Sequence, residues 1–497
     1  MQHNRVGVRK LFKQFGHFSL VLLFGVSSLS AQSFEDFKRT EVASFQKYKD
    51  EKDEAFNKYL KAQWKEYNVY KGTPLYEKPK PKSIAQAKPL PVKSVGPKVR
   101  IEVASIKVPP QKEVVEKPII VVELKPEPKE SKVTKAIMLD FYGTTLGFDM
   151  PRGLEGAKFY PQNQKGISNF FVTAASSEYE VLVSELLKVG KEMQLNDWGL
   201  YLLVLDVSNH IFKNEDDSRL LSWFLFNKLG YAVKIGLANK HTILMHYSQK
   251  VIYSTPNYTF GGKKYYVVSN YAKGSVGNLY SYEQSYPGAD KALDLALPKL
   301  PLFNSDIKSK TLSFKELGKE YTVPLSYNQN LINFMATYPQ ADYETFFNAP
   351  VDALTYKEIA TALKKYVDGK HASDAMNFVL HFVQKSFEYQ IDDQQFGREK
   401  VMFAQETLYF EKSDCEDRAI LFSYLIKELF GVGVIGVKYK DHMTTALNVP
   451  MEGDLVRAGS RKFVVADPTY INATIGQSMP QYKSLRPENF IVVQKDL

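Results

Sequence analysis

The stretch of sequence that decides the fold is SDCEDRAILFSYLIKELF, residues 413–430. After Cys415, the only cysteine in the chain, apolar side chains fall on nearly every face of a helix, which predicts a buried central helix. Asp414 or Ser413 can cap this helix, so the thiol falls in its first turn. The positive end of a helix favours thiolate, and we therefore expect a lowered pKa for Cys415.

Downstream of this helix the chain supplies an imidazole and then a carboxylate. Residues 432–439, 443–449 and 462–466 alternate or are β-branched, which predicts strands. His442 begins one of these strands and Asp467 follows the next, so neighbouring strands can hold the two side chains together. A thiol, an imidazole and a carboxylate are the parts of a nucleophilic triad. In that arrangement His442 is the base and Asp467 fixes its tautomer.

The first residues have the layout of a cleaved export signal, which we place at residues 1–31. Basic residues precede an apolar run at residues 18–26, and small residues lead to Ala31. A membrane anchor is the alternative, but the run is short for ~30 Å of hydrocarbon. We expect an exported protein, periplasmic or extracellular, with no transmembrane span after cleavage. A lone cysteine in such a chain forms no intramolecular disulfide and is either reactive or buried and inert.

Length and charge limit the classes of function. The chain has 497 residues, 44% of them hydrophobic, enough for two sizeable cores. The formal net charge is +10, with many lysines in the leader and the linker. Such a charge suits anionic envelope polymers or headgroups, and it suits a solvated linker equally well. No feature indicates nucleic-acid recognition.

Two segments precede the domains. Residues 32–71 predict one amphipathic helix with an aromatic stripe, which we expect to dock on a partner or on the later domains. Residues 72–131 are rich in proline, lysine and valine, which predicts an extended, semi-rigid spacer.

The rest of the chain carries the marks of an internal duplication. Residues 169–180 align without gaps to residues 333–344, and the helix pattern around Asp217 repeats around Asp417. Residues 263–270 then align to residues 460–467. Three matches in the same order predict two tandem domains, residues 132–302 and 303–497. The expected class is α+β, with an antiparallel sheet packed on a central helix in each domain.

The second domain resembles a known family. DCEDRA at residues 414–419, then His442, then DPT at residues 467–469, look like the transglutaminase-like superfamily of papain-like thiol enzymes. The resemblance covers roughly residues 306–497. It implies that Cys415 is the nucleophile, His442 the base and Asp467 the third member, in acyl transfer from an amide to water or an amine through a thioester. Ser413 departs from the family, where many members carry glycine.

Other polar residues near the motif have weaker signals. Gln405 and Tyr389 are candidates to stabilise an oxyanion, beside the helix N–H groups, although such residues are more often structural. We expect Glu416 and Asp417 to complement the helix N-terminus and a basic side chain. The acidic residues of 392–399 (Asp392, Asp393 and Glu399) match no dedicated metal loop, and we expect them to be solvated. No metal and no cofactor are predicted.

The first domain differs at the positions that carry the chemistry. Glu215 aligns with Cys415 and Asn270 with Asp467, while His241 lies near the position of His442. A carboxylate does not replace a thiol in thioester chemistry. We interpret residues 132–302 as a degenerate copy retained for structure or for binding a partner.

These observations leave two hypotheses of different classes. The first is an exported cysteine peptidase, amidohydrolase or acyltransferase that acts on protein or peptide amides, with hydrolysis favoured over cross-linking. The second is a non-catalytic envelope binding or scaffold protein built from two transglutaminase-like modules. A complete triad in one copy and its loss in the other favour the first. An envelope polymer or another envelope protein is a candidate partner for the N-terminal helix or the first domain.

Overall fold

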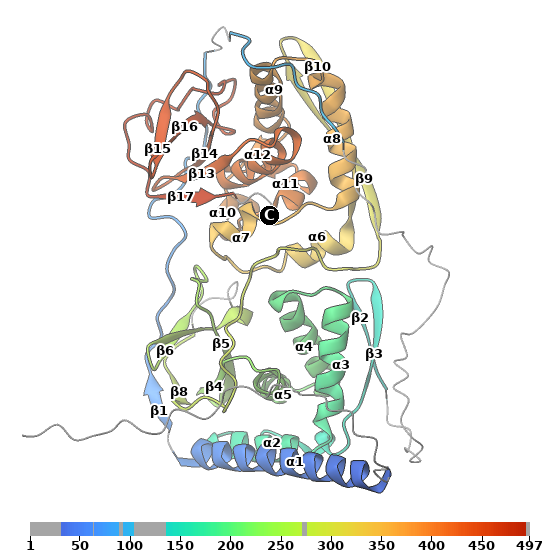
Figure 1. The fold of residues 1–497 in the computed structure, drawn as a ribbon. Helices are drawn as coiled ribbons and strands as arrows, with labels where there is room; N and C mark the ends of the chain where they lie inside the picture. Colours follow the sequence, from blue (N-terminus) through green and yellow to red (C-terminus); the bar gives the residue numbers. More distant parts are fainter. Residues whose placement is uncertain (1–30, 63, 89–92, 104–135, 271–275, 494–497) are drawn as a thin grey trace, which may run out of the picture. The chain divides into compact units, whose positions relative to one another are not determined.

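The computed structural model describes residues 31–62, 64–88, 93–103, 136–270 and 276–493 (Figure 1). The predicted signal peptide lies outside these residues except for Ala31, and so does the linker from residue 104 to 131. The chain forms two compact units, one up to Glu54 and one from Ala55 onward. Among the helices in the described residues, none combines the length and apolar character needed to cross a bilayer.

The N-terminal helix α1, Ala31–Ala62, is shorter than the sequence predicts. Residues expected to extend it form strand β1, Trp64–Tyr67, which pairs antiparallel with β8, Leu279–Tyr282. The indole N–H of Trp64 donates to the carbonyl of Leu60 at 2.7 Å, at the point where the helix ends. A single helix over residues 32–71 is therefore wrong beyond Ala62, because pairing with β8 satisfies the backbone of residues whose aromatic side chains suit a strand.

The last turns of α1 dock on the domain that follows, as the aromatic stripe predicts. Phe56 is 2% exposed, and its ring lies edge-on against Phe171, Tyr282 and Tyr286 with centroids 5.3–5.7 Å away. Asn57 accepts a hydrogen bond from the hydroxyl of Ser168 at 2.6 Å. Buried aromatic contacts of this kind stabilise beyond their apolar area.

The N-terminal half, residues 136–297, contains a hairpin, helices and five strands of an antiparallel sheet, which β1 completes in the order β1-β8-β4-β5-β7-β6. Its helix α5 starts at the residue that aligns with Cys415 and is buried along most of its length. The remaining elements are β2 Ala136–Phe141, β3 Thr144–Asp149, η1 Leu154–Gly156, α2 Gln164–Ala175, α3 Tyr179–Glu192, α4 Asp197–Ile211, α5 Glu215–Lys228, β4 Val233–Ala238, β5 His241–Tyr247, β6 Asn257–Phe260, β7 Lys263–Tyr266 and η2 Val268–Asn270.

The C-terminal half, residues 306–493, has the same kinds of element around a buried helix α12, and its sheet has the order β15-β16-β14-β13-β17. The three predicted strands correspond to β13, β14 and β16, so the predicted α+β class is confirmed. The elements are β9 Ile307–Glu316, β10 Lys319–Asn328, α6 Gln329–Met335, α7 Tyr343–Phe347, α8 Ala353–Val367, α9 Ala372–Lys385, β11 Glu388–Tyr389, α10 Asp392–Gln395, α11 Ala404–Tyr409, β12 Lys412–Ser413, α12 Cys415–Phe430, β13 Val434–Lys438, β14 Met443–Leu447, β15 Leu455–Ala458, β16 Arg461–Ala466 and β17 Asn489–Val492.

Both sheets follow one topology. The order β8-β4-β5-β7-β6 after α5 matches the order β17-β13-β14-β16-β15 after α12, strand for strand. The aligned glycines of β4 and β13 serve the same purpose, since a Cβ on Gly236 would lie 2.7 Å from Leu279 and one on Gly436 would lie 2.8 Å from Phe347. Each sheet therefore needs glycine at this position, because a side chain there would collide with a neighbouring apolar side chain.

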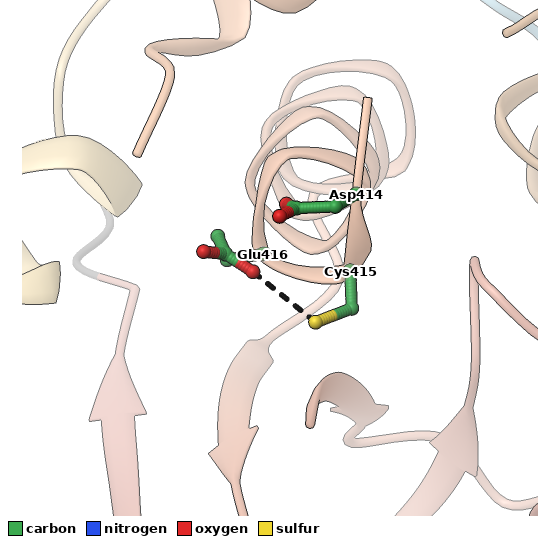
Figure 2. Close-up of side chains that lie close together, drawn as sticks. All are labelled: Asp414, Cys415 and Glu416. Atoms are coloured by element: carbon green, nitrogen blue, oxygen red, sulfur yellow. Dashed lines mark hydrogen bonds between the residues drawn. The ribbon is translucent and has the colours of Figure 1, made fainter. Parts of the chain in front are cut away.

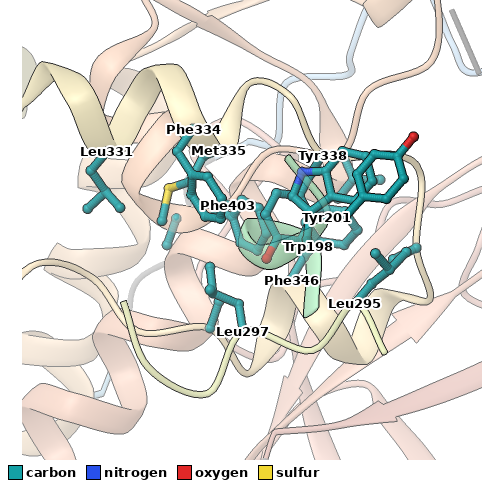
Figure 3. Packing of buried hydrophobic residues seen from close by; sticks show 14 of the residues in the cluster. Trp198, Tyr201, Leu295, Leu297, Leu331, Phe334, Met335, Tyr338, Phe346 and Phe403 are labelled. Carbon is teal, nitrogen blue, oxygen red and sulfur yellow. The ribbon is translucent and has the colours of Figure 1, made fainter. Parts of the chain in front are cut away.

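A hydrophobic cluster continues from one half into the other (Figure 3). Trp198 of α4 is 2% exposed and lies 5.9 Å from the ring of Tyr338, while its indole N–H donates to the Thr337 hydroxyl at 2.9 Å. The side-chain amide of Asn196 donates to the Tyr338 hydroxyl at 2.6 Å. Apolar side chains of the two halves pack together here, and the polar groups at the edge of this packing are hydrogen-bonded. Both halves accordingly belong to the same compact unit.

We predict that Trp198→Ala lowers the free energy of unfolding by about 3–5 kcal/mol, because it removes a large buried side chain and the bond to Thr337. Urea unfolding followed by circular dichroism measures this change. Leu187→Ala, at a side chain that is 52% exposed on α3, is the matched control and should change stability by less than about 0.5 kcal/mol. Equal effects of the two substitutions would contradict the role of this cluster.

Candidate active site

Cys415 is the first residue of α12, and Asp414 is its N-cap, one of the two residues predicted for that position. The backbone N–H of Asp414 donates to Oδ2 of Asp417 at 3.2 Å, which fixes the start of the helix. The thiol is fully buried, and its Sγ lies 3.1 Å from Oε2 of Glu416 (Figure 2). The thiol therefore donates a hydrogen bond to a carboxylate on its own helix.

The expected lowering of the thiol pKa is wrong for this arrangement. Burial raises the pKa of Cys415 well above its ordinary value, and the charges of Glu416 and Asp414 raise it further. Only Lys80 opposes them. Burial and two neighbouring carboxylates outweigh the helix dipole, because thiolate here is both desolvated and next to like charge.

The predicted imidazole–carboxylate pair is formed. Nε2 of His442 lies 3.0 Å from Oδ2 of Asp467, and both residues are buried. Oδ1 of Asp467 accepts the backbone N–H of Thr469 at 2.9 Å, so the carboxylate is held from both sides. The imidazole also stacks on the ring of Tyr482, with centroids 4.6 Å apart. This leaves Nδ1 of His442 as the nitrogen that can act as a base.

Cys415 and this pair lie around the same tyrosine, Tyr482. In the described part of the chain no hydrogen bond joins Sγ to His442. Burial raises the pKa of Tyr482, and the charges of Asp441, Cys415 and Asp467 add to the effect, so all three lie within electrostatic reach of the ring that stacks on His442.

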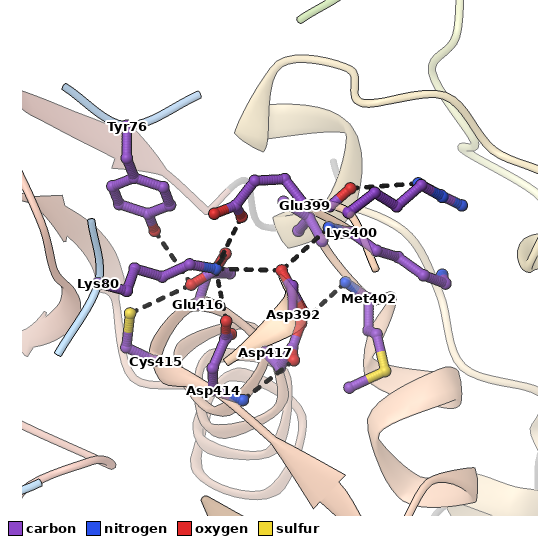
Figure 4. A network of polar contacts seen from close by, with 12 residues as sticks. Tyr76, Lys80, Asp392, Glu399, Lys400, Met402, Asp414, Cys415, Glu416 and Asp417 are labelled. Atoms are coloured by element: carbon purple, nitrogen blue, oxygen red, sulfur yellow. Dashed lines mark hydrogen bonds and ion pairs between the residues drawn. The ribbon is translucent and has the colours of Figure 1, made fainter. Parts of the chain in front are cut away.

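A lysine from the predicted linker lies beside the thiol (Figure 4). The ammonium of Lys80 is surrounded by four carboxylates at 2.5–3.0 Å: Asp392, Glu399, Asp414 and Glu416. Glu416 is shared, because its Oε1 binds Lys80 at 2.6 Å while its Oε2 accepts from the thiol and, at 3.0 Å, from the Tyr76 hydroxyl. We call these four carboxylates the Lys80 pocket.

The pKa values of the acidic residues in the first turn of α12 shift in different directions. Burial raises the pKa of Asp414 and of Asp417 well above the ordinary value, and the charges of Asp392 and Glu416 act in the same direction. Burial would also raise the pKa of Glu416, but the Lys80 ammonium and hydrogen bonds to it lower the pKa instead. In this first turn Glu416 is therefore the acidic residue whose charged form its surroundings favour.

The linker is not only a spacer. From Leu75 to Ala87 it lies on the C-terminal half, and we call residues 74–88 the strap. The backbone N–H of Lys78 donates to the carbonyl of Lys440 at 3.3 Å, and that of Ala87 donates to Ile471 at 2.7 Å. These contacts lie next to His442 and Asp467 in sequence, so the strap crosses the region between α12 and the sheet. The prediction of an extended, semi-rigid spacer over residues 72–131 did not include this packing of the strap on the C-terminal half.

The two candidate oxyanion residues have different surroundings. The Tyr389 hydroxyl donates to the carbonyl of Pro81 in the strap at 2.7 Å, so it already binds a peptide carbonyl near the thiol. The side-chain amide of Gln405 accepts from the backbone of Asp352 at 2.9 Å and donates to Thr355 at 3.1 Å. Gln405 is therefore engaged in packing against α8, and Tyr389 is the better placed of the two.

Ser413, the departure from the family pattern, binds a buried arginine. Nε of Arg418 donates to the Ser413 hydroxyl at 3.0 Å, and its Nη groups donate to the carbonyls of Gln384 and Phe387. The side-chain amide of Gln384 donates to the carbonyl of Asp467 at 3.0 Å. One hydrogen-bonded chain thus joins the first turn of α12 to the third member of the proposed triad.

The N-terminal half lacks this chemistry at the matching place. Glu215 begins α5 as Cys415 begins α12, but its side chain is 83% exposed and pairs with Arg219. His241 begins β5, and its Nδ1 lies 3.0 Å from Asp216. Asn270 is the last residue of η2.

Several residues of the site were missed by the sequence analysis, namely Lys80, Tyr76, Tyr482, Gln384 and Arg418. The apolar pair at Leu75 and Tyr76 inside a proline- and lysine-rich segment was the one signal that the linker packs on a domain.

The expectation that Asp392 and Glu399 are solvated is wrong, because both face the Lys80 pocket, whereas Asp393 is exposed. Two sets of carboxylates have ligand atoms within 4.8 Å of one another, a spacing suited to a metal ion: Asp392, Glu399 and Glu416, and Asp392, Asp414 and Asp417. In this arrangement the Lys80 ammonium pairs with all three carboxylates of the first set and with Asp392 and Asp414 of the second. The predicted pairing of Glu416 with a basic side chain is confirmed.

The comparisons with known proteins identify no relative. No protein-family model, no curated protein and no solved structure matches this chain.

We predict a pH dependence of stability from Glu399. Burial raises its pKa from 4.5 to about 8 despite Lys80, so the folded protein holds a proton that the unfolded chain loses. The free energy of unfolding should therefore fall as pH rises from about 4.5 to about 8, by up to about 1.4 kcal/mol per pH unit for this group. Glu399→Gln should remove that part of the slope in urea unfolding at pH 5 to 8.

Asp393→Asn is the control for this measurement. It changes an exposed carboxylate six residues earlier in the chain and should leave the slope unchanged. A Glu399→Gln protein with the slope of the wild type would show that this carboxyl is not protonated in the folded state.

Proposed function

We propose that this chain is an exported, transglutaminase-like thiol enzyme that transfers the acyl group of a protein or peptide amide through a thioester on Cys415. The observation that carries the proposal is the pair formed by His442 and Asp467, 3.0 Å apart, at the start of β14 and the end of β16, in the domain whose central helix begins with Cys415. Water is the favoured acyl acceptor, which makes the reaction a hydrolysis. The export signal at residues 1–31 and a periplasmic or extracellular location are part of the proposal.

The shared topology of the two sheets supports two transglutaminase-like modules, residues 132–302 and 303–497. In both, the third residue of the buried helix is an aspartate that accepts a loop N–H: Asp217 from Phe159 at 2.7 Å and Asp417 from Met402 at 2.8 Å. Only the second module has a thiol at the first residue of that helix. This contrast on a common scaffold favours a catalytic second module and a degenerate first one.

The reaction follows from the groups present once the strap has moved from the thiol. The Sγ proton passes to Nδ1 of His442, and the sulfur attacks the amide carbonyl carbon. In this proposal the backbone N–H groups of the first turn of α12 and the Tyr389 hydroxyl, which already donates to a peptide carbonyl, bind the oxyanion. The C–N bond then breaks as the imidazolium returns its proton to the leaving amine. Water, deprotonated by the same imidazole, hydrolyses the thioester and releases the acid.

A second candidate function is a non-catalytic envelope protein in which both modules bind a partner. The observation that favours it is the fully buried thiol with its raised pKa beneath the strap. In that case Cys415 is a core residue and the strap is a permanent part of the domain. An envelope polymer or another envelope protein would then bind at the N-terminal helix or the first module.

We predict that Cys415→Ala lowers the turnover of a peptide-amide library by at least about 10³-fold, because no other group can form the thioester. Amine release measures turnover, and alkylation by an iodoacetamide probe reports the thiol. Because Lys80 lies beside the thiol, the comparison is made both in the natural chain and in Lys80→Gln.

The matched control is Ser423→Ala, a buried change later in α12 that leaves the thiol in place. If the proteins with and without the thiol release amine at the same rate in both backgrounds, the catalytic proposal fails and the binding function remains.

A further inference from the structure

The Lys80 pocket is built to hold one small cation. Asp392, Asp414 and Glu416 are at most 1% exposed, and each offers an oxygen to the ammonium at 2.5–3.0 Å. Glu399 completes the ring of oxygens at 2.8 Å. The second oxygens of Asp392 and Asp414 are buried and have no hydrogen-bond partner. The pocket therefore has more acceptor capacity than Lys80 uses.

Lys80, which occupies this pocket, belongs to the strap, an extended segment whose main chain forms hydrogen bonds with the C-terminal half. The strap bonds through its backbone on the His442 side, from Lys78 to Lys440, and further along from Ala87 to Ile471. Between these points the carbonyl of Pro81 accepts from Tyr389, the candidate carbonyl-binding group. Main-chain bonds with one side chain placed in a pocket are how peptide-binding clefts combine affinity and specificity.

We propose that the Lys80 pocket is a subsite for the charged lysine side chain of the peptide on which Cys415 acts, and that the strap occupies this subsite in cis. The inference rests on the proposed function and adds the substrate class: peptides that carry a lysine beside the amide that reacts. The thiol and the subsite are joined by one carboxylate, since Glu416 bonds to Sγ at 3.1 Å and to Nζ of Lys80 at 2.6 Å.

The pocket recognises the lysine rather than using it as a nucleophile. Burial lowers the pKa of Lys80, but the charges of Asp414, Glu416 and Asp392 outweigh it and raise the pKa well above its ordinary value. An amine held as ammonium has no lone pair with which to attack an acyl group. The oxygens converge on a point charge, which suits an ammonium better than the planar fork of a guanidinium.

The same geometry explains why the thiol is covered. With the strap in place Sγ is fully buried, and the backbone of residues 76–81 takes the path that a substrate would need. A peptide with a lysine must displace Lys80 to reach the thiol. In the resting chain the strap thus acts as a pseudosubstrate that covers the Cys415 thiol.

Lys80→Ala tests the subsite by a binding measurement that does not depend on catalytic turnover. This substitution removes the atoms of n-propylammonium, so 1–100 mM n-propylammonium chloride should raise the melting temperature of Lys80→Ala and saturate. Sodium chloride and 1-propanol at the same concentrations should not. Lys82→Ala, two residues along the strap at an exposed lysine, should show no response. Calcium chloride serves as a separate arm, because the same carboxylates have a spacing suited to a metal.

The substrate class is tested in Lys80→Gln, which keeps a polar side chain, one bond shorter than lysine, and removes its charge. Cys415 in this variant should be alkylated at least about tenfold faster than in the natural chain or in Lys82→Gln. Peptide amides with lysine should be turned over at least about tenfold faster than the same peptides with norleucine, the ratio expected for losing a charge-assisted hydrogen bond.

Rescue by n-propylammonium together with a preference for lysine peptides would support the proposal. Turnover that needs Cys415 but treats lysine and norleucine alike would overturn it and leave the proposed function standing. Rescue without turnover in any Cys415-containing protein would overturn the proposed function, and the substrate class with it. Stabilisation of Lys80→Ala by calcium and not by n-propylammonium would replace the subsite with a metal site. If Lys80→Ala does not fold, the alkylation and peptide comparisons in Lys80→Gln decide.

Discussion

The constraint on which the C-terminal half depends is the burial of acidic groups at the start of α12. Asp414, Glu416 and Asp417 follow one another around the first turn, and none of them reaches solvent. Buried carboxylates must be protonated, paired or hydrogen-bonded, because leaving them charged and alone costs many kcal/mol. Asp414 and Glu416 meet this demand with the ammonium of Lys80, and Asp417 meets it with the backbone N–H groups of Met402 and Asp414. The fold of the domain and the path of the strap are therefore coupled.

This coupling joins the site to parts of the chain that are distant in sequence. Arg418 reaches from the helix to the end of α9 through the carbonyls of Gln384 and Phe387, and Gln384 holds the backbone of Asp467. The hydrogen bonds converge from three elements on the space beside Cys415. The N-terminal half keeps the helix and the sheet order but exposes Glu215 at the matching position. It is a scaffold of the same topology whose buried helix begins with an exposed carboxylate instead of a buried thiol.

Part of the site was predictable because short-range patterns specify it. A helix that is apolar all round must be buried, and a polar residue at its start is a cap, so the place of Cys415 followed from residues 413–430 alone. The meeting of His442 and Asp467 followed from their places at the ends of neighbouring strands. The pKa of the thiol did not follow, since it depends on burial and on charges whose positions no local pattern contains.

The sequence by itself determined the α+β class, the start of the central helix and the pairing of His442 with Asp467, because these rest on periodicity, on capping and on the places of polar residues at the ends of strands. Only the tertiary structure decided where α1 ends and where the linker lies. Trp64–Tyr67 became a strand because β8 offered an open edge. Lys80 left solvent because carboxylates of three separate segments converge on it, and such convergence is a property of the folded chain.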